Sequence, residues 1–179
     1  MSLQTWLTSF TDTWKALAGA ALLSAGLLKF TPLVPPWPDE GGAGASCLAV
    51  AACVIGIVAS YQCRRLNQKR RSVLGIGALV LGALLLVAYV ALAGTRVASL
   101  VQSVQGVEVT RRVVVGTQLR NPADADKTPG QLLALYGLDA GAWTADSVAA
   151  ARLALLCAYM GFYLALTFGI GVTQVRTRD

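Results

Sequence analysis

Residues 63–93 read CRRLNQKRRSVLGIGALVLGALLLVAYVALA, in which five bases precede 22 residues without a charged side chain. The uncharged run, residues 72–93, consists mainly of Leu, Val, Ala and Gly. A helix rises about 1.5 Å per residue, so a run of this length can cross the hydrocarbon core of a bilayer, which is about 30 Å thick. The stretch therefore predicts a transmembrane helix preceded by a short basic loop.

Three further apolar runs of similar length occur at residues 14–34, 43–62 and 147–173. The chain has 179 residues, of which 55% are hydrophobic and 13% are charged. Soluble domains carry about 25% charged residues, so this composition excludes a soluble enzyme. We therefore predict an all-α integral membrane protein with four transmembrane helices. The first of them ends at a proline-rich stretch around Pro35, because proline cannot continue a helix.

The distribution of charge predicts the orientation of these helices. The net charge is +6, and five bases without an acid occupy the hairpin loop at residues 63–71: Arg64, Arg65, Lys69, Arg70 and Arg71. Cytoplasmic loops carry an excess of Lys and Arg, so we expect this loop and both chain termini inside. We expect the five basic side chains to contact lipid headgroups, and we expect no nucleic-acid partner.

The predicted organisation has four parts. Residues 1–13 form an interfacial amphipathic helix, since their apolar side chains recur every three or four positions. Residues 14–93 hold transmembrane helices 1 to 3, and residues 94–146 form an extracytoplasmic loop. Residues 147–179 hold helix 4 and a short cytoplasmic tail. The abundance of alanine and glycine is typical of GC-rich bacterial genomes, so we expect a multi-pass protein of the bacterial inner membrane.

The extracytoplasmic loop between helices 3 and 4 carries the signals of a small α+β element. In residues 107–115, valines alternate with other residues in the period of a half-covered strand. Further along, Thr128 predicts the start of a short helix and Gly137 its end. Trp143 is expected to be an aromatic anchor at the membrane interface, and Thr144 to cap the fourth transmembrane helix.

The chain offers few groups for catalysis or for binding a metal. Histidine is absent, which removes the commonest metal ligand and the commonest general base. The four cysteines lack C-x-x-C spacing, and no acid falls within a predicted span. We therefore expect a protein that is not an enzyme and that has no catalytic residue, metal site or cofactor.

Two bases, Lys29 and Arg152, fall near the outer ends of predicted spans. Long basic side chains at such positions can extend to the headgroups. They can also pair with acids of the outer loops, such as Asp39 or Asp146. A third interpretation places them in a basic ring at the mouth of an oligomeric anion pore.

Small residues recur within the predicted spans at spacings that place them on one side of a helix. Pairs of small residues four apart allow two helices to approach closely in a membrane. The predicted helix-packing residues are Gly75, Ala78, Gly82, Gly161 and Gly169.

These features favour a non-catalytic accessory or assembly subunit of a larger membrane complex. Its partners would be other membrane subunits or copies of itself, together with lipids. The alternative is a self-assembling pore or a membrane-perturbing effector of the toxin or defence type, which requires an oligomer with a polar lining.

The predicted orientation can be tested by labelling single cysteines in a cysteine-free background. A membrane-impermeant reagent added to intact cells should modify a cysteine that replaces Ala123 and should leave one that replaces Asn67 unmodified. The reason is the cluster of bases around Asn67, which retains that loop in the cytoplasm. Labelling at position 67 from outside would contradict the predicted topology.

Overall fold

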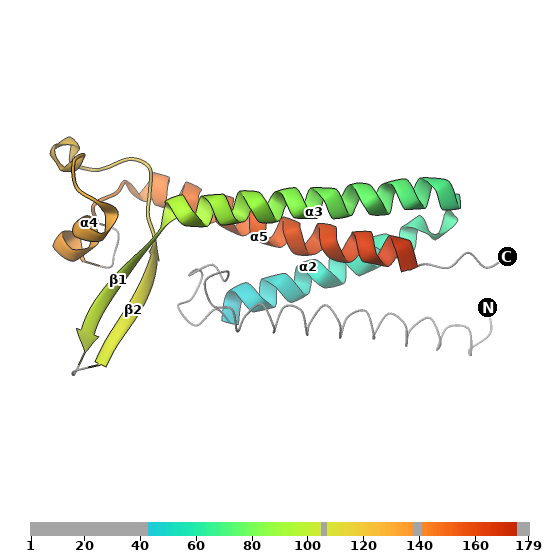
Figure 1. Ribbon diagram of the computed structural model, residues 1–179, viewed down its shortest axis with the longest axis horizontal. Helices are drawn as coiled ribbons and strands as arrows, with labels where there is room; N and C mark the ends of the chain where they lie inside the picture. Colours follow the sequence, from blue (N-terminus) through green and yellow to red (C-terminus); the bar gives the residue numbers. More distant parts are fainter. Residues whose placement is uncertain (1–42, 105–106, 138–140, 175–179) are drawn as a thin grey trace. The chain divides into compact units, whose positions relative to one another are not determined.

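A computed structural model describes residues 43–104, 107–137 and 141–174 (Figure 1). The described residues confirm a mostly helical protein with a small two-stranded sheet. Its elements in chain order are helices α2 (Ala43–Gln62) and α3 (Gln68–Arg96), strands β1 (Val97–Val104) and β2 (Val107–Val114), and helices α4 (Pro129–Tyr136) and α5 (Ala145–Gln174). The amphipathic helix and first transmembrane helix predicted for residues 1–34, and Lys29 with them, lie outside the described residues.

Three of these helices are long and apolar enough to cross a membrane. The candidate spans are Gly44–Gln62, Gln68–Arg96 and Ala145–Thr173, with mean hydropathies of 2.0, 2.6 and 1.9. α2 has the predicted bounds, whereas α3 extends beyond residues 72–93 at both ends. The apolar run marks only the part suited to hydrocarbon, while Lys and Arg continue a helix readily into the polar interface.

The chain divides into two compact units. We define the helical unit as the described part of residues 46–87 and 159–174. It contains most of α2, the first two-thirds of α3 and the second half of α5. We define the hairpin unit as the described part of residues 88–158, in which β1, β2 and α4 lie.

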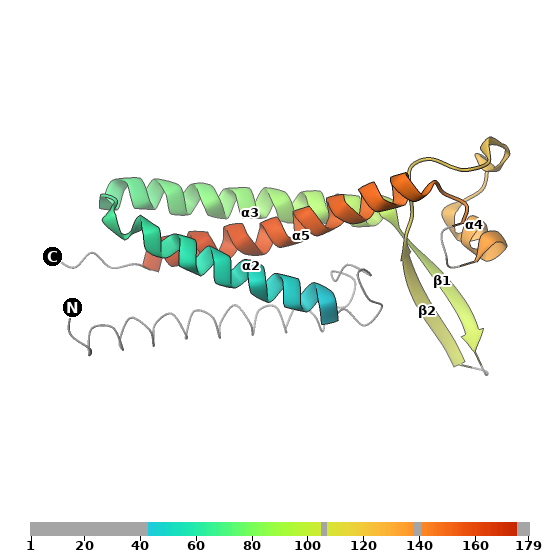
Figure 2. The same ribbon diagram turned by 180° about the vertical axis from the view of Figure 1, so that it is seen from behind.

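In the helical unit, α5 contacts both α2 and α3 (Figure 1, Figure 2). On the α2 side, a Cβ added to Gly56 would lie 2.9 Å from the carbonyl oxygen of Leu164 and would collide with Thr167. Toward the end of the same contact, a Cβ on Gly171 would lie 2.7 Å from the Cβ of Ser60. Glycine therefore allows the two helices to approach to a distance that any side chain would prevent.

The contact between α3 and α5 also depends on glycine. A Cβ on Gly75 would lie 2.7 Å from Cγ2 of Thr173, and one on Gly169 would lie 2.9 Å from Cγ of Leu79. The approach is less tight at Gly82, where the backbone nitrogen of Leu166 is 3.5 Å from the added atom. The two helices run in opposite directions, since residues early in α3 meet residues late in α5.

The buried hydroxyl groups of the helical unit are satisfied within their own helices. Ser60 donates a hydrogen bond of 2.7 Å to the carbonyl oxygen of Ile57, and Thr167 donates one of 2.7 Å to that of Tyr163. Such bonds remove the cost of placing a hydroxyl where no water is available. The rings of Tyr159 and Phe162 each meet the ring of Tyr163 edge-on, with centroids 5.0 Å apart.

In the hairpin unit, β1 and β2 form an antiparallel hairpin that follows α3 directly. The register runs from Val97 opposite Val114 to Val104 opposite Val107. The faces alternate along each strand, and one face packs on the core of the unit. That core consists of Val115, Leu132, Leu133, Ala142, Trp143 and Val148, with Ala98, Leu100, Val113 and Leu119 packed against it.

Two predictions for the chain before α5 are wrong. Trp143 is no interfacial anchor, because its side chain is 5% exposed within the core of the hairpin unit and its backbone bridges to Leu119. A large aromatic ring buries a large apolar area, and this burial in a core stabilises the fold. Thr144 precedes the helix as predicted, but its Oγ1 is buried without a hydrogen-bond partner and therefore does not cap α5.

The tight contact at Gly56 predicts opposite responses to the same substitution at two glycines. Gly56→Ala should destabilise the protein by about 1–3 kcal/mol, because the new methyl group meets backbone that cannot move easily. Gly77→Ala is the matched control, since no atom lies within 4 Å of the added Cβ and alanine favours the helix by up to about 1 kcal/mol. Thermal unfolding in detergent measures both, and equal stability of the two variants would contradict the packing.

Candidate functional site

The predicted helix-packing residues of α3 lie at spacings of three and four residues, which place them on one side of the helix. Gly75 and Gly82 on this side meet α5, and Ala78 between them is partly buried. On α5, Gly169 lies against Leu79. A Cβ added to Gly161 would lie 3.1 Å from Cδ1 of Leu85.

The structure also brings Gly56 and Gly171 into the packing, and neither was among the predicted helix-packing residues. The sequence does carry a signal for the α2 face, because Gly56 and Ser60 are two small residues four apart, a spacing that permits close approach of helices.

The five clustered bases do not share one environment. Arg65, Lys69 and Arg70 are exposed, whereas the side chain of Arg71 is 5% exposed. Arg64 belongs to the 3₁₀ turn Cys63–Arg65 that follows α2. Of the four bases whose exposure the structure describes, three therefore face outward and Arg71 is buried.

Arg152 lies in the second turn of α5, within the hairpin unit, and is partly buried. Its Nε atom is buried and has no hydrogen-bond partner. The pairing with Asp146 considered above is not found in the described part of the chain. Asp146 instead occupies the first turn of α5, where a carboxylate interacts favourably with the helix dipole.

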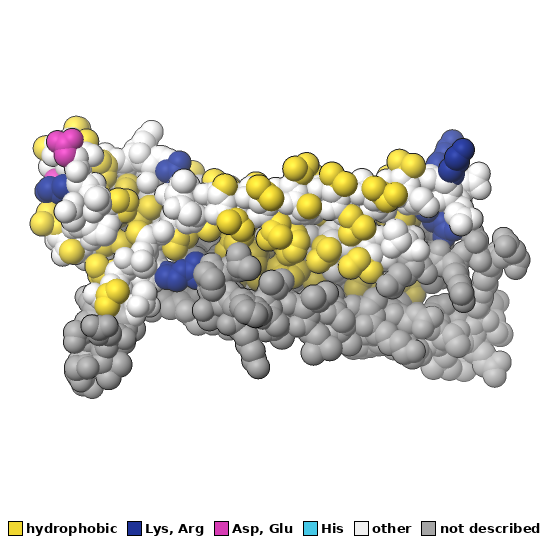
Figure 3. All heavy atoms as spheres, in the orientation of Figure 1, with side chains coloured by type: hydrophobic (Ala, Val, Ile, Leu, Met, Phe, Trp, Pro, Cys, Tyr) yellow, Lys and Arg dark blue, Asp and Glu magenta, His cyan; other side chains and the backbone are white. Residues whose placement is uncertain are grey.

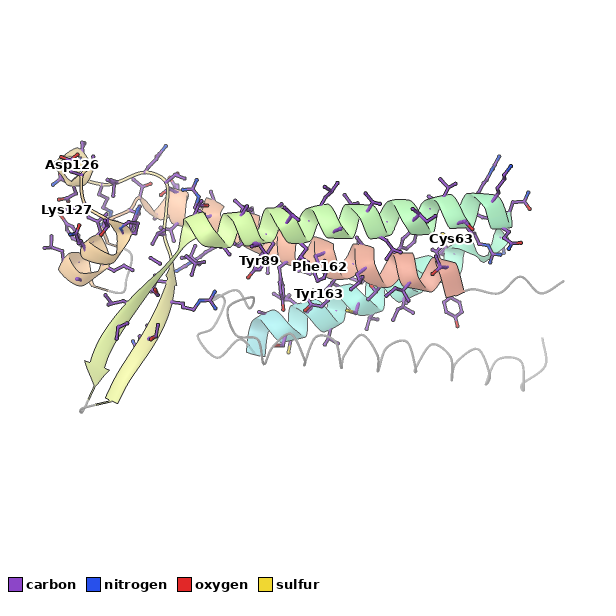
Figure 4. All side chains as sticks on the ribbon, viewed as in Figure 1. Cys63, Tyr89, Asp126, Lys127, Phe162 and Tyr163 are labelled. Atoms are coloured by element: carbon purple, nitrogen blue, oxygen red, sulfur yellow. The ribbon has the colours of Figure 1, made fainter. Side chains whose placement is uncertain are left out.

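A polar cluster in the hairpin unit was missed by the reasoning from sequence. The carboxylate of Asp124 is nearly buried, with 5% of the residue exposed. Its Oδ1 accepts a hydrogen bond of 2.7 Å from Nζ of Lys127, and its Oδ2 accepts one of 2.6 Å from the hydroxyl of Tyr136. Figure 4 labels Lys127 at the edge of this unit. We call these three residues the Asp124 cluster.

Local sequence signals position the members of the Asp124 cluster. The side chain of Asn121 accepts a bond of 3.2 Å from the backbone nitrogen of Ala123, which starts the 3₁₀ turn Pro122–Asp124. Thr128 and Gln131 form a reciprocal capping box at the start of α4. Gly137, with φ of 81°, ends the helix. The turn and the helix thus each present one side of the cluster.

Each member of the Asp124 cluster has a shifted pKa. The hydrogen bonds from Lys127 and Tyr136 lower the pKa of the Asp124 carboxyl, because both stabilise its charged form. The hydrogen bond to Asp124 raises the pKa of Lys127 and also that of Tyr136. The carboxylate is therefore ionised at neutral pH and fully used by two donors, which makes it a link between the turn and α4.

The described residues offer little else on which chemistry could be built. Within residues 43–104, 107–137 and 141–174, no three His, Cys, Asp or Glu side chains come together in a way that could hold a metal ion. Cys47, Cys53, Cys63 and Cys157 are free thiols.

Comparisons with protein-family models, with curated proteins and with solved structures find no match to this chain.

The Asp124 cluster predicts a loss of order in the hairpin unit at acid pH. Because the folded pKa of Asp124 is lowered, its contribution to stability is complete above the unfolded value of about 3.9 and is lost as pH falls through the lower folded value. Fluorescence of Trp143, kept as the single tryptophan, should report this transition. Asp124→Asn should weaken the hairpin unit at pH 7 and flatten the acid dependence, whereas an unchanged acid transition in that variant would contradict the assignment.

Proposed function

We propose that this protein is a non-catalytic integral membrane subunit, an accessory or assembly component of a larger membrane complex. The observation that carries the proposal is an unoccupied apolar stripe along α3 in the helical unit. Its members are spaced alternately four and three residues apart and all are exposed: Val73, Gly77, Val80, Leu84 and Val87. We call this set the outer stripe of α3.

The outer stripe lies opposite the face that packs on α5. Residues of a helix turn by about 100° each, so Gly75 and Gly77 point in nearly opposite directions. Gly75 meets α5, while a Cβ on Gly77 would meet nothing within 4 Å. The space-filling view shows hydrophobic side chains along α3 (Figure 3). α3 therefore has a glycine on each of two faces, and among the described residues α5 occupies the face of Gly75.

The spacing of the outer stripe suits another transmembrane helix better than lipid alone. A repeat of 3.5 residues is the pattern by which two helices interdigitate over several turns. Gly77 lies between Val73 and Val80 in this stripe and carries no side chain, and a small residue at such a position allows a partner helix to come close. In a membrane this close packing replaces the hydrophobic effect as the source of affinity. The expected partner is an apolar helix of another subunit.

The hairpin unit supports the same proposal, although it is a folded module and not a bare apolar helix face. Its core of six buried residues and the internal Asp124 cluster make it a folded module. A folded module outside the bilayer offers a second surface by which subunits can be oriented. This role does not require any of the groups that catalysis would demand.

The proposal predicts that bulk at Gly77 removes partner subunits from the complex. Gly77→Ile should abolish stoichiometric association of different subunits after mild detergent extraction, measured by native mass spectrometry. The chain itself should remain folded, since a Cβ built at this position meets no described atom within 4 Å beyond the local backbone of α3. Ala83→Ile is the matched control, because it adds similar bulk at an exposed position of α3 outside the stripe.

Two outcomes would contradict the accessory-subunit proposal. If the wild-type chain is a monomer in every mild detergent, the outer stripe faces lipid and does not bind a partner helix. A wild-type chain found only as copies of itself would favour the alternative, a self-assembling pore or membrane-perturbing effector. In that assembly the unpartnered Nε of Arg152 would be the group to examine for contact with anions.

A further inference from the structure

Basic side chains gather where α2 turns into α3, and Figure 3 shows them at the start of α3. The structure separates them by exposure. Arg65, Lys69 and Arg70 are exposed, and none of the three has an ion pair with a described residue. We call these three the basic trio. Arg71 is 5% exposed and stands apart from them.

Helical periodicity explains this separation. Arg71 precedes Gly75 by four residues and Gly82 by eleven, so it lies on the face of α3 that packs in the helical unit. Lys69 precedes Val73 by four residues and lies on the outer face. One turn of helix thus directs neighbouring bases of the same charge into two different environments.

The basic trio lies close to the apolar parts of two candidate spans. α2 ends at Gln62 and α3 begins at Gln68, and the connection is a 3₁₀ turn in which the backbone nitrogen of Leu66 donates to the carbonyl oxygen of Cys63 at 3.0 Å. When α2 and α3 span a bilayer, so short a connection holds the trio at the depth of the lipid headgroups.

Charge complementarity identifies the ligand. The sequence contains no Asp or Glu from residue 41 to residue 107, so no acid on these two helices or in their connection neutralises the trio. Guanidinium groups bind phosphate through paired hydrogen bonds, and lysine binds it as a point charge. An anionic phospholipid places a phosphate at the depth where the trio lies.

We propose that Arg65, Lys69 and Arg70 form a binding site for the headgroups of anionic phospholipids, while Arg71 serves to hold α3 in the helical unit. This inference rests on the membrane insertion assumed in the proposed function and is independent of any partner subunit. Each base close to an anionic surface strengthens the attraction about fivefold. Loss of all three should therefore weaken selection of anionic lipid by about 100-fold, less where salt screens the charges.

The test uses the purified full-length chain reconstituted in bilayers of equal parts phosphatidylglycerol and phosphatidylcholine. After detergent extraction, the two lipids that remain bound are quantified by mass spectrometry. The wild type should retain phosphatidylglycerol in preference to phosphatidylcholine. The triple variant Arg65→Gln, Lys69→Gln, Arg70→Gln should lose this preference and keep its thermal stability. Arg71→Gln should lower the unfolding temperature, and the folded fraction should retain the preference.

Arg120→Gln is the control for net charge, because Arg120 is an exposed base of the hairpin unit and its loss should leave the preference unchanged. Retained preference in the triple variant, or equal loss in Arg120→Gln, would overturn the site. Displacement of the lipid by inorganic phosphate at the same concentration would overturn the assignment to lipid. The chain is measured without partners, so failure to find partner subunits would leave this result standing.

Discussion

Close contact between helix backbones at glycine is the constraint on which the helical unit depends. Lipid chains are as apolar as leucine, so transmembrane helices gain little by hiding apolar side chains from their surroundings. They gain instead from dense van der Waals contact, which falls steeply with distance. Gly56 on α2, Gly75 on α3 and Gly169 on α5 each remove the atom that would hold two helices apart. α5 consequently meets a neighbour on each of two sides.

The hairpin unit is stabilised differently, by a buried apolar core and by a hydrogen-bonded carboxylate. Trp143 and Leu133 are buried with the other core residues beneath one face of the hairpin. Asp124 joins the turn before α4 to the end of that helix through two charge-assisted hydrogen bonds. A buried carboxylate is costly unless it is hydrogen-bonded, and here each carboxylate oxygen of Asp124 accepts a hydrogen bond.

The outer stripe of α3 and the basic trio give the helical unit two outward surfaces of opposite character. The stripe is apolar and has no side chain at Gly77, whereas the trio is cationic, and its Lys69 lies one helical turn before Val73. A partner helix that occupies the stripe would continue toward the lipid-headgroup site that we propose at the trio. An anionic lipid at that position would screen the bases and so reduce repulsion of any basic residues that a partner carries there.

The sequence by itself determined the elements, because their signals are local. Length and hydropathy predicted α2 at its observed bounds, and Thr128 and Gly137 marked the ends of α4. The valine alternation placed a strand where β2 lies. Each of these signals depends on residues only a few positions apart. Helix caps act through local hydrogen bonds, and strands show in the alternation of side chains along the chain.

Only the tertiary structure decided which faces are occupied. Gly75 and Gly77 are alike in sequence context, yet one contacts α5 and the other contacts nothing, and Arg70 and Arg71 divide in the same way. The sequence predicted Trp143 as an interfacial anchor, but the structure buries its ring in the core of the hairpin unit. Tyr136 bonds a carboxylate twelve residues away. In each case the deciding neighbour is distant in sequence, and hydropathy and periodicity carry no information about distant neighbours.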